Sequence, residues 1–119
     1  MRELTFDLDD RGDVVVARVD GEIDSSNASE LQLALAARVP SAASVLALDL
    51  SGVTYLDSSG IELLFGLGRS LAARRQAIRL IVPETAPVRR VLELCAVESV
   101  APIDGDLADV LAAIAGPTD

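Results

Sequence analysis

Apolar and polar residues alternate at the start of the chain. Leu4, Phe6 and Leu8 are separated by polar residues, which is the period of a strand with one exposed face. The apolar run over 14–19 predicts a second, more buried strand. The segment 9–13 between them has the composition of a turn, so we expect an antiparallel hairpin whose first strand lies at the edge of a sheet.

A helical spacing of apolar residues follows a polar loop over 20–27. Ser26 or Asn27 is expected to cap this helix, with Glu30 as the acidic residue of its first turn. Pro40 is expected to end it. The residues predicted to face inward are Leu31, Ala34, Leu35 and Val39.

The centre of the chain joins a strand to a second helix. The apolar run 45–50 is bounded by Ser44 and by Ser51-Gly52; it favours a strand covered on both faces, and by periodicity alone a buried helix fits as well. After the polar turn Asp57-Ser58-Ser59-Gly60, apolar residues return at helical spacing. The stripe predicted to face inward consists of Ile61, Leu64, Phe65, Gly68, Leu71 and Ala72.

Beyond the central helix, strands and helices continue to alternate. The positive residues of Arg74-Arg75-Gln76 are suited to the end of that helix, and a strand over 78–82 is expected to end at Pro83. Thr85 is predicted to cap a further helix. The apolar stripe of that helix consists of Val88, Val91, Leu92 and Cys95.

The last predicted elements are a short strand over 99–101 and a helix opened by Asp106. The segment 116–119 is expected to fray, which leaves one domain over 1–115. The stripe of the last helix consists of Leu107, Val110, Leu111 and Ile114.

An initial hairpin followed by alternating helices and strands predicts an α/β fold, with a mostly parallel sheet and helices packed against it. Sites in such sheets form beyond the carboxyl ends of the strands. The strand 45–50 therefore delivers the turn 57–60 to that edge. Asp24 would lie at the same edge if the strand over 14–19 runs parallel to its neighbour.

Composition excludes several classes of function. The formal net charge of −9 argues against a nucleic-acid partner, because binding to phosphate needs clustered positive charge. The N-terminal segment lacks the apolar core of a leader peptide, and every apolar run is too short to span a bilayer. We expect a cytoplasmic protein that does not contact a membrane.

Residue counts also argue against common catalytic sites. The chain has one cysteine and no histidine, so neither a Ser-His-Asp triad nor a Cys-His pair can form. It has no metal-ligand cluster and no glycine-rich phosphate loop. Cys95 lies on an apolar stripe, which favours a buried, inert thiol. We therefore expect no enzymatic activity and no cofactor.

The turn 57–60 is the strongest candidate site. The first turn of a helix has unpaired N–H groups and the positive end of the macrodipole, which stabilise an anion or accept a capping oxygen. Asp57, Ser58 and Ser59 are all candidate caps. A serine at this position is either an ordinary cap or a hydroxyl that receives a phosphoryl group.

The segment VTYLDSSGIELL resembles the signature of STAS-domain anti-sigma factor antagonists, and Gly21-Glu22-Ile23-Asp24 matches that family's upstream element. In that family a partner anti-sigma factor kinase phosphorylates the serine directly after the aspartate, and a protein phosphatase removes the phosphate. The resemblance implies that Ser58 is the acceptor and that Asp24 lies beside it. Without the resemblance, Asp24 is an ordinary turn carboxylate. The residues expected to contact the partner are Asp24, Asp57, Ser59, Gly60, Glu62, Leu63 and Leu67.

The role of Leu63 and Leu67 has two interpretations. They lie one residue off the inward stripe, so they either fill a groove on the partner or widen the buried face of the helix. The resemblance implies that the unphosphorylated protein binds the kinase and releases a sigma factor. The alternatives are a non-switching STAS subunit of a stress-signalling or lipid-transport assembly, and a small ligand-binding or enzymatic α/β protein.

Overall fold

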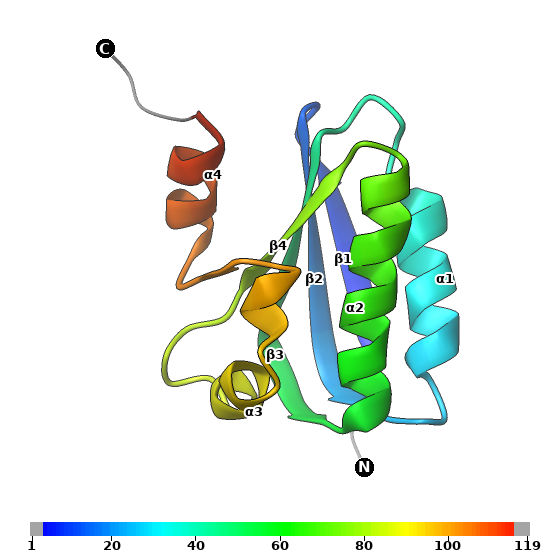
Figure 1. Ribbon diagram of the computed structural model, residues 1–119, viewed down its shortest axis with the longest axis vertical. Helices are drawn as coiled ribbons and strands as arrows, with labels where there is room; N and C mark the ends of the chain where they lie inside the picture. The colour runs from blue at the N-terminus through cyan, green and yellow to red at the C-terminus, as the bar shows by residue number, and fades with distance from the viewer. Residues whose placement is uncertain (1–3, 116–119) are drawn as a thin grey trace.

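One five-stranded sheet organises the protein. The computed structural model describes residues 4–115 and has the strand order β1-β2-β3-β4-β5 (Figure 1). β1 pairs antiparallel with β2, and the remaining neighbours pair parallel. The predicted α/β class and N-terminal hairpin are confirmed. The strands are β1 (Thr5–Asp10), β2 (Val14–Ile23), β3 (Val45–Leu56), β4 (Ala77–Ile81) and β5 (Ile103–Asp104).

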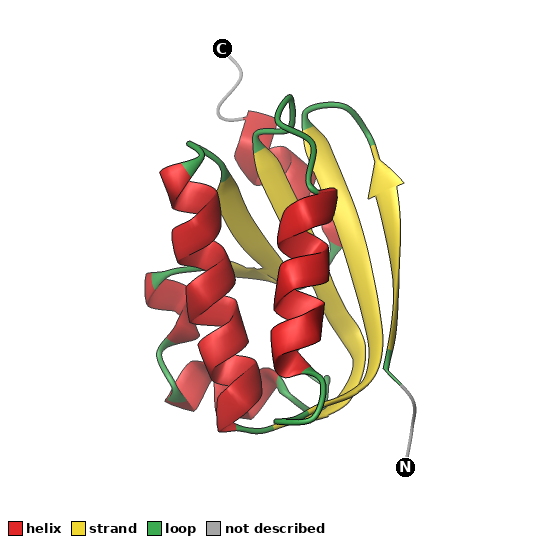
Figure 2. Ribbon diagram, turned by 90° about the vertical axis from the view of Figure 1, so that its right-hand side faces the viewer, coloured by secondary structure: helices red, strands yellow, loops and turns green. Residues whose placement is uncertain are grey.

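Helices cover both faces of this sheet. α1 and α2 lie side by side on one face, and α4 lies on the other (Figures 1 and 2). α3 and the short 3-10 helix η1 follow β4 near the end of the sheet where α2 begins. The helices are α1 (Ala28–Arg38), α2 (Ser58–Ala73), α3 (Arg89–Leu94), η1 (Val97–Ser99) and α4 (Leu107–Ala115).

The core follows from the alternation of side chains along the central strand. Leu46, Leu48 and Leu50 point toward α1 and α2 and are buried. Ala47 points the other way and packs with Val110 of α4. Because α2 places buried leucines against this sheet, its position relative to the end of β3 is fixed by apolar packing.

β2 and β3 are both longer than the sequence predicted. β2 continues through Gly21 to Ile23, where we predicted a loop, and β3 continues from the predicted end at 50 to Leu56. Register shifts interrupt their pairing after Arg18 and after Gly21, which has a φ of 115°. A Cβ at Gly52 would lie 1.7 Å from an oxygen of Asp20. These glycines therefore allow irregular pairing to continue; they do not end the strands.

The C-terminal third needs three corrections. The short strand predicted over 99–101 is β5 at Ile103–Asp104, and η1 occupies 97–99. The Thr85 cap is wrong, because α3 begins at Arg89. Cys95, at the C-cap of α3, is exposed, so the predicted buried thiol is wrong; of the helix residues Arg89–Leu94 only Leu92 is buried.

Of the remaining predictions for the helices and the C-terminus, some are confirmed and others are wrong. Asp106 caps α4 as expected, because its Oδ1 accepts a hydrogen bond of 2.8 Å from the Asp109 N–H. Ala72 and Leu111, both predicted to face inward, are exposed. The expected fraying of 116–119 falls outside the described residues. Within 4–115, no helix is long and apolar enough to cross a membrane.

Candidate functional site

The site is built where two parallel strands end together. Ile23 at the end of β2 is paired with Leu56 at the end of β3. The N–H of Asp57 donates a hydrogen bond of 3.3 Å to the carbonyl of Ile23. Asp24 and Asp57, which directly follow the paired residues, therefore lie at one edge of the sheet, as adjacent parallel strands require.

Asp57 caps α2. Its backbone is extended, with φ −105° and ψ −165°, and its Oδ1 accepts a hydrogen bond of 2.8 Å from the Ser59 N–H. Of the three candidate caps, Asp57 performs the role. Ser58 is the first residue of the helix and is exposed, whereas Ser59 is half-buried. Within residues 4–115, the Ser58 hydroxyl has no hydrogen-bond partner.

Gly60 allows the first turn of α2 to approach the end of β3 closely. It is buried, and a Cβ there would lie 2.6 Å from Cγ of Leu56 and 3.3 Å from Cγ2 of Ile23. We predicted Gly60 as a partner contact. The structure instead gives it a packing role, because any side chain would push the Ser58 turn away from the sheet.

The loop after β2 presents a carboxylate beside this turn. Oδ1 of Asp24 accepts hydrogen bonds from the Ser26 hydroxyl at 2.5 Å and from the Ser26 N–H at 2.9 Å. These two bonds, the hydroxyl first, hold the pKa of Asp24 below its ordinary value. Asp24 is therefore ionised and held in one orientation at neutral pH.

The predicted cap of α1 is wrong in detail. Asn27 occupies the N-cap position, but its side chain makes no capping hydrogen bond. Its amide bonds instead to the backbone of Glu22 and Asp24, at 2.9 Å and 3.0 Å. A sequence reading detects a helix-starting asparagine and cannot tell which way its amide points.

Leu63 and Leu67 do not form a partner surface. They are 1% and 0% exposed and belong to the main core. Of the two interpretations, the structure supports a wider buried face of the helix. α2 packs against α1 on one side and against the sheet on another. More of its circumference is therefore buried than a single apolar stripe would cover. Glu62 remains exposed one turn from Ser58, and Phe65 is half-buried.

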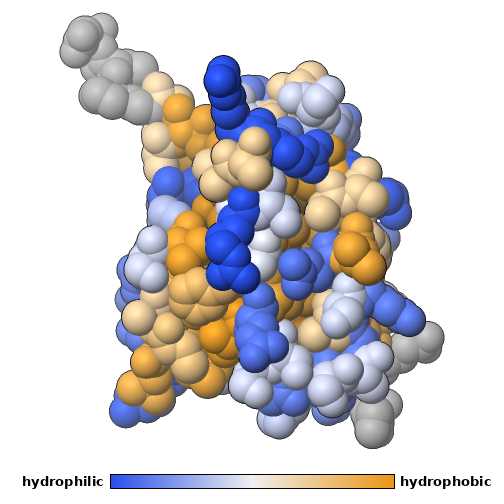
Figure 3. Space-filling view, turned by 45° about the vertical axis from the view of Figure 1, so that its right-hand side comes forward, coloured by the Kyte–Doolittle hydropathy of each residue, from blue (hydrophilic) through white to orange (hydrophobic). Residues whose placement is uncertain are grey.

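An aromatic residue beside the turn escaped the sequence analysis. Tyr55 lies two residues before Asp57 and is 49% exposed. Figure 3 shows that the hydropathy of the surface is mixed at the lower end of the molecule. An apolar area lies at the lower left, and polar residues lie on the other side. Exposed tyrosines are frequent anchors in interfaces, and this one is the penultimate residue of β3, two positions before the capping Asp57.

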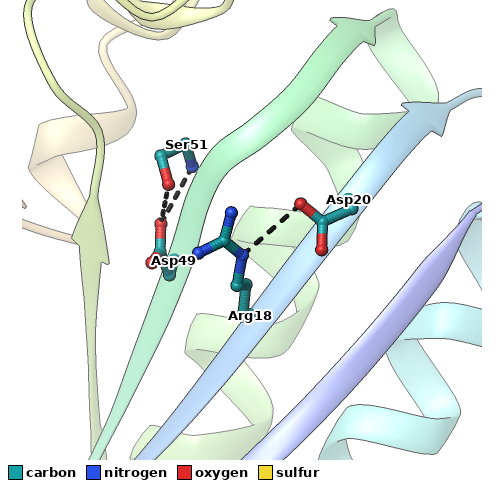
Figure 4. A network of polar contacts seen from close by, with 4 residues as sticks. All are labelled: Arg18, Asp20, Asp49 and Ser51. Carbon is teal, nitrogen blue, oxygen red and sulfur yellow. Dashed lines mark hydrogen bonds and ion pairs between the residues drawn. The ribbon is translucent and has the colours of Figure 1, made fainter.

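A second polar group lies on the opposite face of the sheet (Figure 4). Arg18 contacts Asp20 at 3.4 Å, and Asp49 accepts hydrogen bonds from the N–H and hydroxyl of Ser51. The Arg18 side chain is 57% exposed, so this ion pair is screened by water and contributes little. These polar side chains belong to the middle of β2 and β3 and not to the Ser58 turn.

Comparison with known proteins identifies the family. The sequence model described as "Mlab, STAS domain" matches residues 6–103. The chain belongs to the STAS domain family. Among solved structures, an anti-sigma factor antagonist from Mycobacterium paratuberculosis is 29% identical, with 95% of each chain covered and a TM-score of 0.82.

Two structures of SpoIIAA share the fold of this STAS domain. The unphosphorylated anti-sigma factor antagonist SpoIIAA is 20% identical over 97% of this chain and 100% of its own, with a TM-score of 0.75. The phosphorylated form of the Bacillus protein gives 20% identity over 92% and 99%, with a TM-score of 0.63. The predicted family and fold are confirmed.

The geometry of this STAS domain suits an anion at Ser58. The residue lies at the N-terminus of a helix of 16 residues, where the macrodipole and first-turn N–H groups stabilise negative charge. Asp57 already provides the cap, so the hydroxyl of Ser58 is not needed for helix stability. A group added to this oxygen therefore meets solvent and does not disturb the core.

Proposed function

We propose that this protein is a phosphorylation-controlled anti-sigma factor antagonist. When Ser58 is unphosphorylated, the protein binds an anti-sigma factor that is also a serine kinase, and the sigma factor is released. The observation that carries this proposal is the exposed, unpartnered Ser58 hydroxyl on a turn whose capping role belongs to Asp57. The protein works in the cytoplasm as a binding module without chemistry of its own.

Charge and bulk at the contact are the proposed switch. A phosphate on Ser58 adds about −1.5 to −2 at neutral pH. In a kinase site this dianion faces the phosphates of the bound nucleotide, and Asp57 lies directly beside it. Repulsion and crowding then favour dissociation, and a protein phosphatase restores the binding form.

The proposed contact surface surrounds the Ser58 turn. Asp24, Asp57, Ser59 and Glu62 are retained from the sequence prediction, and Tyr55 is added because it is exposed and lies two residues before Asp57. Leu63, Leu67 and Gly60 are omitted because they are buried. The acidic groups favour a partner with positive charge around its kinase site.

Replacing Ser58 tests the acceptor assignment. With the cognate anti-sigma factor kinase and ATP, we expect the wild type and Ser59→Ala to be labelled, and Ser58→Ala to lose labelling, because it lacks the exposed oxygen. Phosphopeptide mapping measures the position. Labelling of Ser58→Ala at the wild-type level, or a phosphate mapped to Ser59, would refute the assignment.

A non-switching STAS subunit of a stress-signalling or lipid-transport assembly is the second candidate. It is retained because the matching family description names Mlab, so family membership alone does not specify the switch. This candidate predicts stable partner binding that is indifferent to Ser58. The labelling experiment therefore separates the two functions.

A further inference from the structure

Asn27 lies at the junction of α1 with the end of β2, close to the proposed phosphorylation site. It precedes the first residue of α1 and so occupies the N-cap position, with φ −132° and ψ −14°, yet its side chain does not cap. Its carbonyl accepts a hydrogen bond of 3.0 Å from the Leu31 N–H, so its backbone is tied to the first turn of α1. The side-chain amide is free to point backward along the chain.

That amide bridges the end of β2. Nδ2 donates a hydrogen bond of 2.9 Å to the carbonyl of Glu22, and Oδ1 accepts one of 3.0 Å from the N–H of Asp24. The two bonds lie on either side of Ile23. They hold its peptide groups in place from both directions.

Ile23 in turn contacts the Ser58 turn directly. Its side chain is 1% exposed, and its carbonyl accepts the hydrogen bond of 3.3 Å from the Asp57 N–H. This bond is long for an N–H to oxygen contact, so it is sensitive to small movements of the carbonyl. Asp57 then sets the first turn of α2 through its bond to the Ser59 N–H.

We infer that Asn27 is a positioning residue, whose bridging amide fixes the Ile23–Asp57 hydrogen bond and thereby the orientation of Ser58 relative to Asp24. The inference rests on the proposed function, in which Ser58 is the phosphate acceptor. Serine and aspartate cap helices about as well as asparagine does. Of these three side chains, only the asparagine amide supplies an acceptor and a donor on separate atoms at neutral pH, as this bridge requires.

The first test uses the isolated protein. In Asn27→Ser, which keeps a good helix-capping residue, we expect hydrogen exchange of the Asp57 amide to be about fivefold faster, the factor for one weakened hydrogen bond. The amide of Leu48, in the middle of β3, should exchange at the wild-type rate. The matched control is Ser26→Ala, which alters the same loop without touching the bridge and should leave Asp57 unchanged.

The second test is the efficiency of phosphorylation. With the cognate kinase, and at a temperature where both proteins are fully folded, kcat/KM for Asn27→Ser should fall about tenfold, because a misoriented Ser58 reacts more slowly. Asn27→Asp, which keeps the acceptor atom but places a carboxylate oxygen against the Glu22 carbonyl in place of the donor, should give a fall at least as large. It also replaces Asn27→Ser in both tests if that variant does not fold.

Three results of the exchange experiment would each overturn the inference: Asp57 exchange within about twofold of wild type in Asn27→Ser, equal acceleration at Leu48, or the same acceleration in Ser26→Ala. An unchanged kcat/KM alongside faster Asp57 exchange would also overturn it. If the wild type is not phosphorylated at all, the proposed function fails, and the exchange measurement still decides whether Asn27 holds the turn.

Discussion

Protein phosphorylated on Ser58 should bind its anti-sigma factor kinase about a hundredfold more weakly than unmodified protein, a loss of about 3 kcal/mol. The phosphate projects from an exposed position at the start of α2. The helix N-terminus stabilises this charge within the free protein, so the cost falls on the complex. There the dianion meets the nucleotide phosphates and the surrounding groups of the partner's kinase site, which the free protein does not face.

Titration calorimetry with the purified kinase measures this loss. Ser58→Asp carries a smaller charge and should lose affinity only partly. Ser70→Asp, at an exposed position near the other end of α2, is the matched charge control and should keep the wild-type affinity. Amide spectra of the phosphorylated protein should change only around residues 57–63. Shifts throughout the sheet would mean that the switch acts by refolding.

Leu67→Ala should lower the free energy of unfolding by about 3 kcal/mol, the usual cost of emptying a leucine site in a well-packed core. Leu67 is 0% exposed and packs between α2 and the sheet. Domains of this kind commonly have about 5–15 kcal/mol of stability, so the variant should still fold. Urea denaturation provides the measurement.

The control for this prediction is Leu33→Ala, because Leu33 is 72% exposed on α1; it should change stability by less than about 0.5 kcal/mol. The folded Leu67→Ala protein should retain its affinity for the kinase. If Leu67→Ala left the free energy of unfolding nearly unchanged and abolished binding to the kinase, Leu67 would be a partner contact, and its burial would be contradicted.

The order of strands and helices could be predicted because it depends on local patterns. The alternation in 4–8 and the apolar run 45–50 each follow from burial on one or both faces of a sheet. The ends of β2 and β3 could not be predicted, because glycines such as Gly21 and Gly52 usually indicate the end of a strand in a sequence. Their tolerance depends on a neighbouring strand that only the fold brings close.

Some features of the candidate site could likewise be predicted from the sequence, and others could not. The turn 57–60 and its proximity to Asp24 follow from a helix that begins where a parallel strand ends. The burial of Leu67 depends on how much of α2 is covered by α1, which no single helix reveals. Likewise, the backward orientation of the Asn27 amide depends on the position of the β2 end relative to α1.

Release of the sigma factor is the outcome in which the unmodified and phosphorylated proteins should differ. A preformed complex of the anti-sigma factor kinase with a fluorescently labelled sigma factor would be mixed with either unmodified protein or protein phosphorylated on Ser58, and free sigma factor measured by anisotropy. We expect unmodified protein to release the sigma factor and the phosphorylated form to leave the complex intact at the same concentration. Equal release by both forms, or release by neither, would contradict it.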